Sequence, residues 1–216
     1  MASLVPPSPR AADAKRPRYL VVALVTALAF GFGCWTDGCA RLTFYRGDKD
    51  FGAAHNSMIK DDGDRSKADA LYRKFVEIAD ATRKRVIPMA SASFVLGAAL
   101  LAIAARGLAG RSNARSALMQ VVAAQAAVVV ASHFVTAEYR EAERDWQMDR
   151  ELLVRKEKMR PDEYAQLVPM MSDMRRYVFP GWLVIRTIAS GLIVIALSRP
   201  RSREFFEAAA GQAAER

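Results

Sequence analysis

The eighteen residues YLVVALVTALAFGFGCWT, at positions 19–36, contain no charged side chain. A helix rises about 1.5 Å per residue, so one of this length crosses a hydrocarbon core of about 30 Å. Buried helices of soluble proteins are usually shorter and keep a polar face. Tyr19 and Trp35 stand near the two ends, where amphipathic rings meet membrane interfaces. The stretch predicts a membrane-spanning helix.

Three further stretches share this length and near absence of charge, at 86–105, 116–137 and 177–198. Four spans predict an all-α fold: a polytopic membrane protein with a four-transmembrane-helix bundle. The charged connections, 41–85 and 138–176, would lie as helical loops on one side. The bundle domain covers 19–200, between a disordered, proline-rich basic tail at 1–18 and a short C-terminal tail at 201–216.

The loops themselves carry helix signals. Ser66 and Asp69 resemble a capping box, and the apolar spacing beyond them predicts a helix that continues into the second span through Pro88. The third span should continue as a helix to residue 160, and Pro161 should begin another. Pro169 and the Pro180–Gly181 pair should break or kink the approach to the fourth span. Phe205 and Phe206 suggest a short interfacial helix.

The net charge of +9 does not indicate nucleic acid binding. The two loops are nearly balanced, with 11 basic and 8 acidic residues in the first and 9 and 10 in the second. The surplus lies in the N-terminal tail, the turn at 106–115 and the start of the C-terminal tail, where arginines meet lipid headgroups. The lipid bilayer is therefore the expected partner. The basic cluster before span one favours cytoplasmic N- and C-termini in a bacterial inner membrane.

Cys34 and Cys39 are the only cysteines of the chain. Lipidation or cleavage at Cys34 is disfavoured, because no aliphatic residue stands three positions before it. Membrane thiol oxidases need a second cysteine pair, so the sequence does not favour thiol redox chemistry. A structural disulfide requires the helix to end near Trp35, and two free thiols are equally compatible with the sequence. We expect no metal or cofactor, and we expect the methionines to pack apolar surfaces.

A polar group inside the apolar stretches is the candidate site. Arg186 lies well inside span four, where an arginine is costly unless it is paired, wetted or snorkelling. The antiparallel third span places polar residues near the same depth. The predicted pocket comprises Arg186, His133, Ser132, Thr136, Gln125, Asp37 and Glu138. Asp37 or Glu138 would supply the counter-charge. A structural ion pair, a solute-binding or conduction site, and a subunit contact all fit this pattern.

The sequence contains no nucleophile–base pair, phosphate loop or metal signature, so an enzyme is not expected. The first functional hypothesis is a non-enzymatic interaction, sensing or assembly subunit. Its charged loops, with Trp146 and Phe75, would contact a protein partner. The alternatives are a small oligomeric transporter built around the Arg186 pocket and a thiol-redox protein. The small residues Ser93 and Gly97 suit close helix packing within the chain or in a homo-oligomer.

Overall fold

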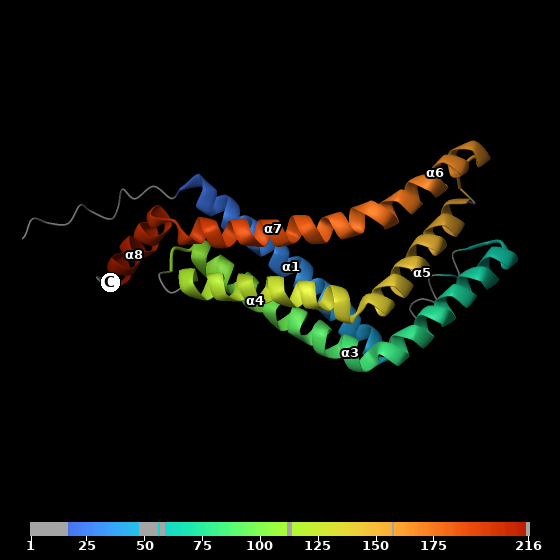
Figure 1. The fold of residues 1–216 in the computed structure, drawn as a ribbon, viewed down its shortest axis with the longest axis horizontal. Coiled ribbons are helices and arrows are strands. Elements are labelled where there is room, and N and C mark those ends of the chain that lie inside the picture. Colours follow the sequence, from blue (N-terminus) through green and yellow to red (C-terminus); the bar gives the residue numbers. More distant parts are fainter. Residues whose placement is uncertain (1–16, 48–55, 57–58, 112–113, 157, 215–216) are drawn as a thin grey trace, which may run out of the picture. The chain divides into compact units, whose positions relative to one another are not determined.

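The computed structural model describes residues 17–47, 56, 59–111, 114–156 and 158–214. The predicted N-terminal tail therefore lies outside the described residues except for its last two positions. Helices account for nearly all of the described chain, and no β-strand occurs in it, which confirms the all-α prediction (Figure 1). The elements, in order, are α1 (Arg18–Arg46), α3 (Asp62–Leu108), α4 (Ala114–Val135), α5 (Ala137–Lys156), α6 (Pro161–Asp173), the π-helical segment η2 (Met174–Val178), α7 (Phe179–Ser198) and α8 (Pro200–Ala214).

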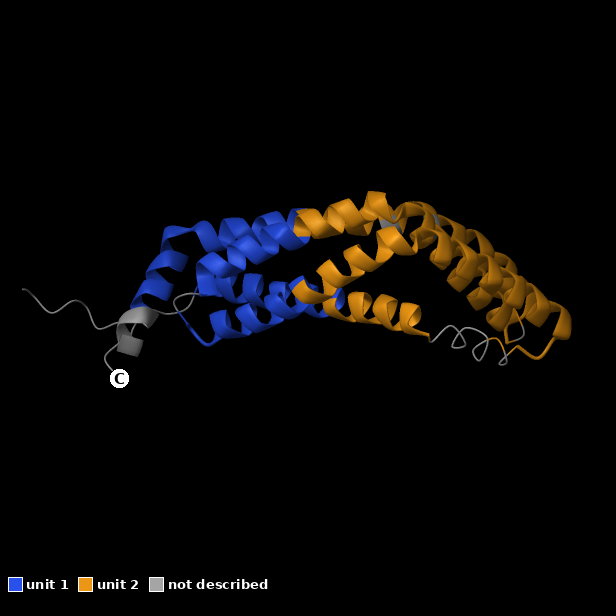
Figure 2. Cartoon of the chain, turned by 90° about the horizontal axis from the view of Figure 1, so that it is seen from below, with its two compact units in different colours: residues 1–34, 96–125, 188–216 blue, residues 35–95, 126–187 orange. Residues whose placement is uncertain are grey.

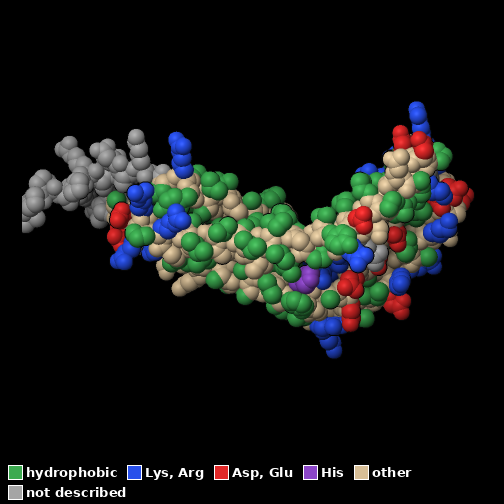
Figure 3. All heavy atoms as spheres, turned by 45° about the horizontal axis from the view of Figure 1, so that its top comes forward, with side chains coloured by type: hydrophobic (Ala, Val, Ile, Leu, Met, Phe, Trp, Pro, Cys, Tyr) green, Lys and Arg blue, Asp and Glu red, His purple; other side chains and the backbone are tan. Residues whose placement is uncertain are grey.

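Four helical segments are long and apolar enough to cross a membrane: α1, α3, α4 and the run Pro161–Ser198. At most a third of each apolar window is buried within the protein. Large apolar side chains such as Val22, Phe32 and Leu192 are exposed instead. In Figure 3, charged side chains gather over α5 and α6 and around α8. So much exposed apolar surface is what a lipid-facing protein presents. The chain is a membrane-embedded helical protein.

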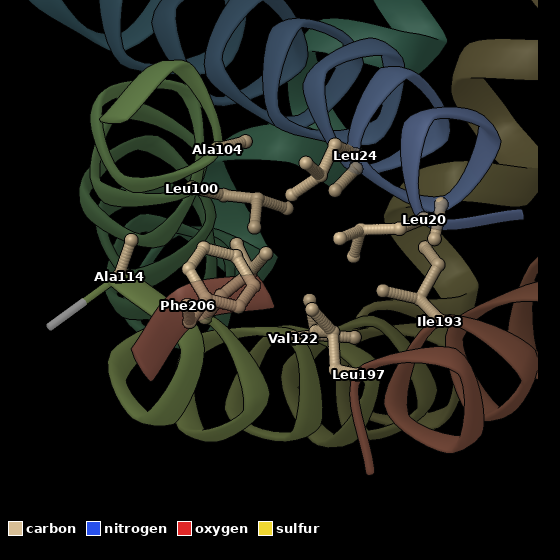
Figure 4. Close-up of a cluster of buried hydrophobic side chains, with 12 residues drawn as sticks. Leu20, Leu24, Leu100, Ala104, Ala114, Val122, Ile193, Leu197 and Phe206 are labelled. Carbon is tan, nitrogen blue, oxygen red and sulfur yellow. The ribbon is translucent and has the colours of Figure 1, made fainter. Parts of the chain in front are cut away.

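The described residues form two compact units (Figure 2). The first unit comprises the described residues of 17–34, 96–125 and 188–214. Its core joins side chains from five helices, which point toward one another in Figure 4. Leu20 and Leu24 come from α1, Leu100 from α3, and Leu197 from α7. Phe206 of α8 is only 2% exposed in this core, so it fills the bundle and does not reach outward as the interfacial prediction supposed.

The second unit comprises residues 35–95 and 126–187. It contains the end of α1, the first part of α3, and α5 and α6. Its core is a cluster of aromatic side chains. The charged helical loops predicted at 41–85 and 138–176 belong to this unit wherever the structure describes them.

Close packing of α1 against α3 depends on glycines within each unit. In the first unit, a Cβ on Gly31 would lie 3.1 Å from the carbonyl oxygen of Gly97. In the second unit, a Cβ on Gly38 would lie 2.7 Å from both the Ala90 carbonyl oxygen and the Phe94 nitrogen. Small residues let two helix backbones approach to this distance. The small-residue pattern at Gly97 thus serves packing within the chain.

Several helix boundaries differ from those predicted. Helix α1 continues past Trp35 to Arg46. Helix α3 begins at Asp62, and its cap is Asp61, whose Oδ1 accepts the Asp64 N–H at 2.8 Å. The cap therefore lies five residues before the predicted Ser66, because Asp61 offers an equally good acceptor earlier in the chain.

The prolines act nearly as expected. Pro88 lies inside the continuous helix α3, and Pro161 begins α6, as predicted. Helix α5 ends at Lys156 and does not reach residue 160. Pro169 is accommodated inside α6, and the irregularity falls instead on η2, just before Pro180.

Candidate functional site

Six aromatic side chains of the second unit form one cluster between α1, α3 and α5. The Phe75 and Trp146 rings stack with centroids 5.3 Å apart, and Tyr72 lies 5.1 Å from Trp146. Tyr139 lies 5.5 Å from Phe75. Phe44 and Tyr45 complete the cluster from the end of α1. Residues three or seven apart share one helix face, which explains how Tyr72 with Phe75, and Tyr139 with Trp146, face the same neighbours.

Arg41 connects this cluster to two carboxylates. Its Nε donates to Asp37 Oδ1 at 3.1 Å, and its Nη2 lies 3.7 Å from Glu143 Oε2. Its guanidinium carbon is 5.3 Å from the centre of the Tyr139 ring. The Tyr139 hydroxyl donates to Glu143 Oε1 at 3.4 Å. Only 14% of the Arg41 side chain is exposed, so this cation is held inside the unit by two acids and one ring.

Glu143, on α5, and Tyr139 both have shifted pKa values. Burial raises the pKa of Glu143 above its ordinary value, because desolvation outweighs the attraction of Arg41. Burial likewise raises the pKa of the Tyr139 hydroxyl, and the neighbouring Glu143 charge adds to the increase. Tyr139 therefore stays protonated and remains a hydrogen-bond donor to Glu143 at physiological pH.

A cavity of about 750 Å³ opens beside this group, and every residue that lines it belongs to the second unit. Its volume falls within the range of about 300–1,000 Å³ that is typical of small-molecule sites. One part of its wall is aromatic: Phe44, Tyr72, Phe75, Tyr139 and Trp146. Another part is methionine: Met148, Met171 and Met174. The charged side chains are Asp37, Arg41, Glu143, Arg150 and Glu151.

Two residues of the cavity wall each have a buried side-chain nitrogen without a hydrogen-bond partner among the described residues: Trp146 Nε1 and Arg150 Nε. Trp146 is 9% exposed. The Arg150 guanidinium lies over the same indole, 5.5 Å from the ring centre. Buried donors are nearly always paired in folded proteins, so two neighbouring unpaired donors in a cavity wall indicate a place for an acceptor.

The structure distributes the polar residues predicted around Arg186 over separate contacts. Gln125, which belongs to the first unit, donates from Nε2 to the Phe30 carbonyl at 3.2 Å. Just after α4, Thr136 Oγ1 donates to the Ser132 carbonyl at 2.7 Å, and the two hydroxyls lie 3.5 Å apart. The ring of His133 contacts the Arg140 guanidinium.

The two expected counter-charges pair with other arginines. Glu138 Oε2 accepts from Arg85 at 2.7 Å, and Asp37 accepts from Arg41. Arg186 itself is half-buried in α7. Of the residues in the predicted pocket, Ser132 and Thr136 contact each other, and Asp37 lines the aromatic cavity.

Cys34 and Cys39 form no disulfide; the first is buried and the second exposed. The disulfide required α1 to end near Trp35, but α1 is continuous to Arg46. Residues five apart on a helix point in different directions, so their sulfur atoms cannot bond. Of the two alternatives that the sequence left open, the structure has the two separate thiols.

Trp146 and Phe75 are placed differently from the expected partner surface. Phe75 is 3% exposed and Trp146 is nearly as buried, because they form the centre of the aromatic cluster. They line the cavity and do not present a flat outer face. Arg41 and Glu143, the charged centre of the site, were not predicted. A usable signal existed: Asp37 and Arg41 stand four apart directly after an apolar stretch, the spacing of a helical ion pair.

No protein-family model, curated protein or solved structure matches the chain.

Proposed function

We propose that this chain is a non-enzymatic integral membrane protein that binds a small apolar or amphipathic ligand in the aromatic cavity of its second unit. Its role would be that of a sensing or assembly subunit. The observation that carries this proposal is the cavity itself, because it combines a large aromatic and methionine wall with a few charged groups. Pockets of this composition bury an apolar body and fix its orientation with polar contacts.

The orientation that we propose has both termini in the cytoplasm of a bacterial cell. The basic cluster before the first span supports it. The second unit would then face the outside of the inner membrane. A full-length chain with a periplasm-active reporter fused at its C-terminus should be inactive, and a cytoplasm-active reporter at the same place should be active. The reverse pattern would overturn this orientation.

Ligand binding can be followed through Trp146. A variant with Trp35→Phe and Trp182→Phe keeps this indole as its only tryptophan. In phosphatidylcholine nanodiscs, amphiphiles with brominated chains should quench Trp146 in a saturable manner, because the bound chain contacts the cavity wall. A second variant that keeps only Trp182, which is 56% exposed on α7, should show non-saturable quenching by amphiphiles dissolved in the bilayer.

A pair of neighbouring substitutions supplies the matched control. Ala40 lines the cavity and is exposed, so Ala40→Phe should fill the cavity without disturbing the core and abolish saturable quenching. Cys39 is exposed and does not line the cavity, so Cys39→Phe should leave quenching unchanged. If no amphiphile quenches Trp146 saturably, the proposed function fails.

A further inference from the structure

We propose that the ligand of this cavity is an anionic amphiphile, whose carboxylate or phosphate head binds at Arg150 and Trp146 and whose apolar tail lies along the aromatic and methionine wall. This inference rests on the proposed function, since it names the ligand class of the same cavity. Three observations support this inference: the charges of the cavity wall, its unpaired hydrogen-bond donors and the closeness of its lining residues to the apolar stretches of the sequence.

Arg150 is the one charged group of the cavity wall that lacks a counter-charge within the described chain. Arg41 has Asp37 and Glu143, while Glu151 Oε1 accepts from Arg155 at 2.6 Å. Arg150 is half-buried and makes no ion pair with a described residue. A partly buried cation is stabilised by an anion with which it can form charge-assisted hydrogen bonds. A negatively charged head would complete this part of the site.

A cationic head is disfavoured because arginines already occupy the aromatic faces. The guanidinium of Arg41 covers Tyr139, and that of Arg150 covers Trp146. Phe75 stacks on the indole as well. The recognition of a cation by an aromatic cage needs free ring faces. At Tyr139 and Trp146, the protein's own arginines therefore occupy the positions that a bound cation would take.

The two unpaired donors fit the same head. Trp146 Nε1 and Arg150 Nε each carry one N–H, and neither has an acceptor among the described residues. The side chains are neighbours, because the guanidinium lies over the indole. Carboxylate and phosphate oxygens accept several hydrogen bonds at once, so one head could satisfy both donors after a small side-chain shift.

The rest of the wall suits a tail. Met148, Met171 and Met174 line the cavity, and the flexible methionine side chain adapts to apolar shapes. The lining also begins close to the apolar stretches of the sequence: Asp37 directly follows 19–36, and Met174 precedes 177–198 by three residues. At about 1.5 Å per residue these positions lie within about 5 Å of the stretch ends. An amphiphile dissolved in the bilayer therefore has a short path to the cavity.

The experiment uses the Trp146-only variant in phosphatidylcholine nanodiscs, with ligand concentration expressed as a mole fraction of lipid. The probes share one chain and differ in their head: brominated oleate, oleyl phosphate, oleyl alcohol and oleylamine. Oleate and oleyl phosphate should bind at least tenfold more tightly than the alcohol and the amine, because a charge-assisted hydrogen bond contributes about that factor or more. Inorganic phosphate, which has no tail, should not compete at equal concentration.

Charge-removal variants locate the head. Arg150→Gln should weaken oleate binding about tenfold and reduce the preference for oleate over oleyl alcohol by about the same factor. Saturable quenching by oleyl alcohol in this variant shows that the cavity remains folded. Arg73→Gln is the matched control, because Arg73 is exposed on α3 and does not line the cavity. It removes the same charge from the same unit and should change oleate binding by less than about twofold.

The failures of the two proposals are distinguishable. Saturable quenching with equal affinity for all four heads, or undiminished oleate selectivity in Arg150→Gln, would overturn the anionic ligand while the binding function stands. Effective competition by inorganic phosphate would overturn the tail-binding part of the inference. Absence of saturable quenching by every probe would overturn the proposed function and the inference together.

Discussion

Arg41 shows how a single side chain organises the second unit. It lies on the last turns of α1, yet it reaches Glu143 on α5 and the face of Tyr139. Its own helix supplies Asp37. Two helices far apart in the sequence are therefore joined by one partly buried cation, beside the cavity that we propose to be the ligand site.

Removal of this cation should destabilise the second unit. Arg41→Ala leaves Glu143 half-buried without its counter-charge. Breaking a fully buried pair costs about 3–5 kcal/mol, and we expect about 2 kcal/mol because Glu143 keeps a quarter of its surface exposed. The midpoint of thermal unfolding in detergent should fall by about 4–8 °C. Arg46→Ala, at an exposed position one turn further along α1, is the control and should shift it little. Equal midpoints for the two variants would contradict the role of Arg41.

The raised pKa of Glu143 predicts a specific pH dependence. Because the folded state holds this proton more tightly than the unfolded state, the free energy of unfolding should decrease as pH rises from the ordinary glutamate value through the raised one. Glu143→Gln cannot titrate and should lose this decrease. Unfolding midpoints between pH 4 and pH 7 measure it, and Glu77→Gln at an exposed position should retain the wild-type profile. A wild-type profile in Glu143→Gln would show that another group titrates.

At the scale of the elements, α1 and α3 are held together by glycines. Gly38 and Gly33 are two glycines of the same helix, α1, and they differ in what surrounds them. A Cβ on Gly38 would meet the α3 backbone, including the Phe94 Cα at 2.9 Å, whereas one on Gly33 has nothing within 4 Å. Backbone atoms cannot move aside as the end of a flexible side chain can, so the two helices must separate to accept a methyl group at Gly38.

The two alanine substitutions should therefore have different effects on the free energy of unfolding. Gly38→Ala should cost about 2 kcal/mol through overpacking and lower the unfolding midpoint by about 5 °C. Gly33→Ala should be neutral or stabilising by up to about 1 kcal/mol, because alanine favours the helix. Thermal unfolding of both variants in the same detergent provides the comparison. If Gly38→Ala is as stable as the wild type, α1 and α3 do not pack at this distance.

Helices were predictable from the sequence wherever apolar periodicity or proline governs them. The continuous α3 through Pro88 and the start of α6 at Pro161 followed from the sequence. Some boundaries were predicted wrongly because two nearby residues could each cap the helix. Asp61 caps α3, and the predicted cap was Ser66. The continuation of α1 beyond Trp35 is supported by packing at Gly38 and by the contact of Arg41 with Glu143, and these tertiary contacts cannot be read from the local sequence.

At the scale of the whole molecule, the apolar stretches predicted the architecture, but not the place of the site. Their composition is a local property and determines which segments suit lipid. The cavity forms where α1, α3 and α5 converge, and the sequence shows this convergence only as aromatic residues scattered over a hundred positions. The predicted polar residues drew attention to Arg186, while the described charge network centres on Arg41.

The central claim, that the exposed apolar faces lie in lipid, can be tested by cysteine labelling in intact membrane vesicles. In a background with Cys34→Ala and Cys39→Ala, single cysteines replace Val22, Val95 and Leu192, which are 65%, 61% and 59% exposed on the protein surface. Cysteines at the exposed charged positions Arg73 and Glu163 are the controls. After the vesicles are permeabilised, a water-soluble maleimide should label the two controls rapidly and leave the three apolar positions unlabelled until detergent is added. If the three apolar positions react as fast as Arg73→Cys before detergent is added, these helices are in water and the membrane-embedded architecture is wrong.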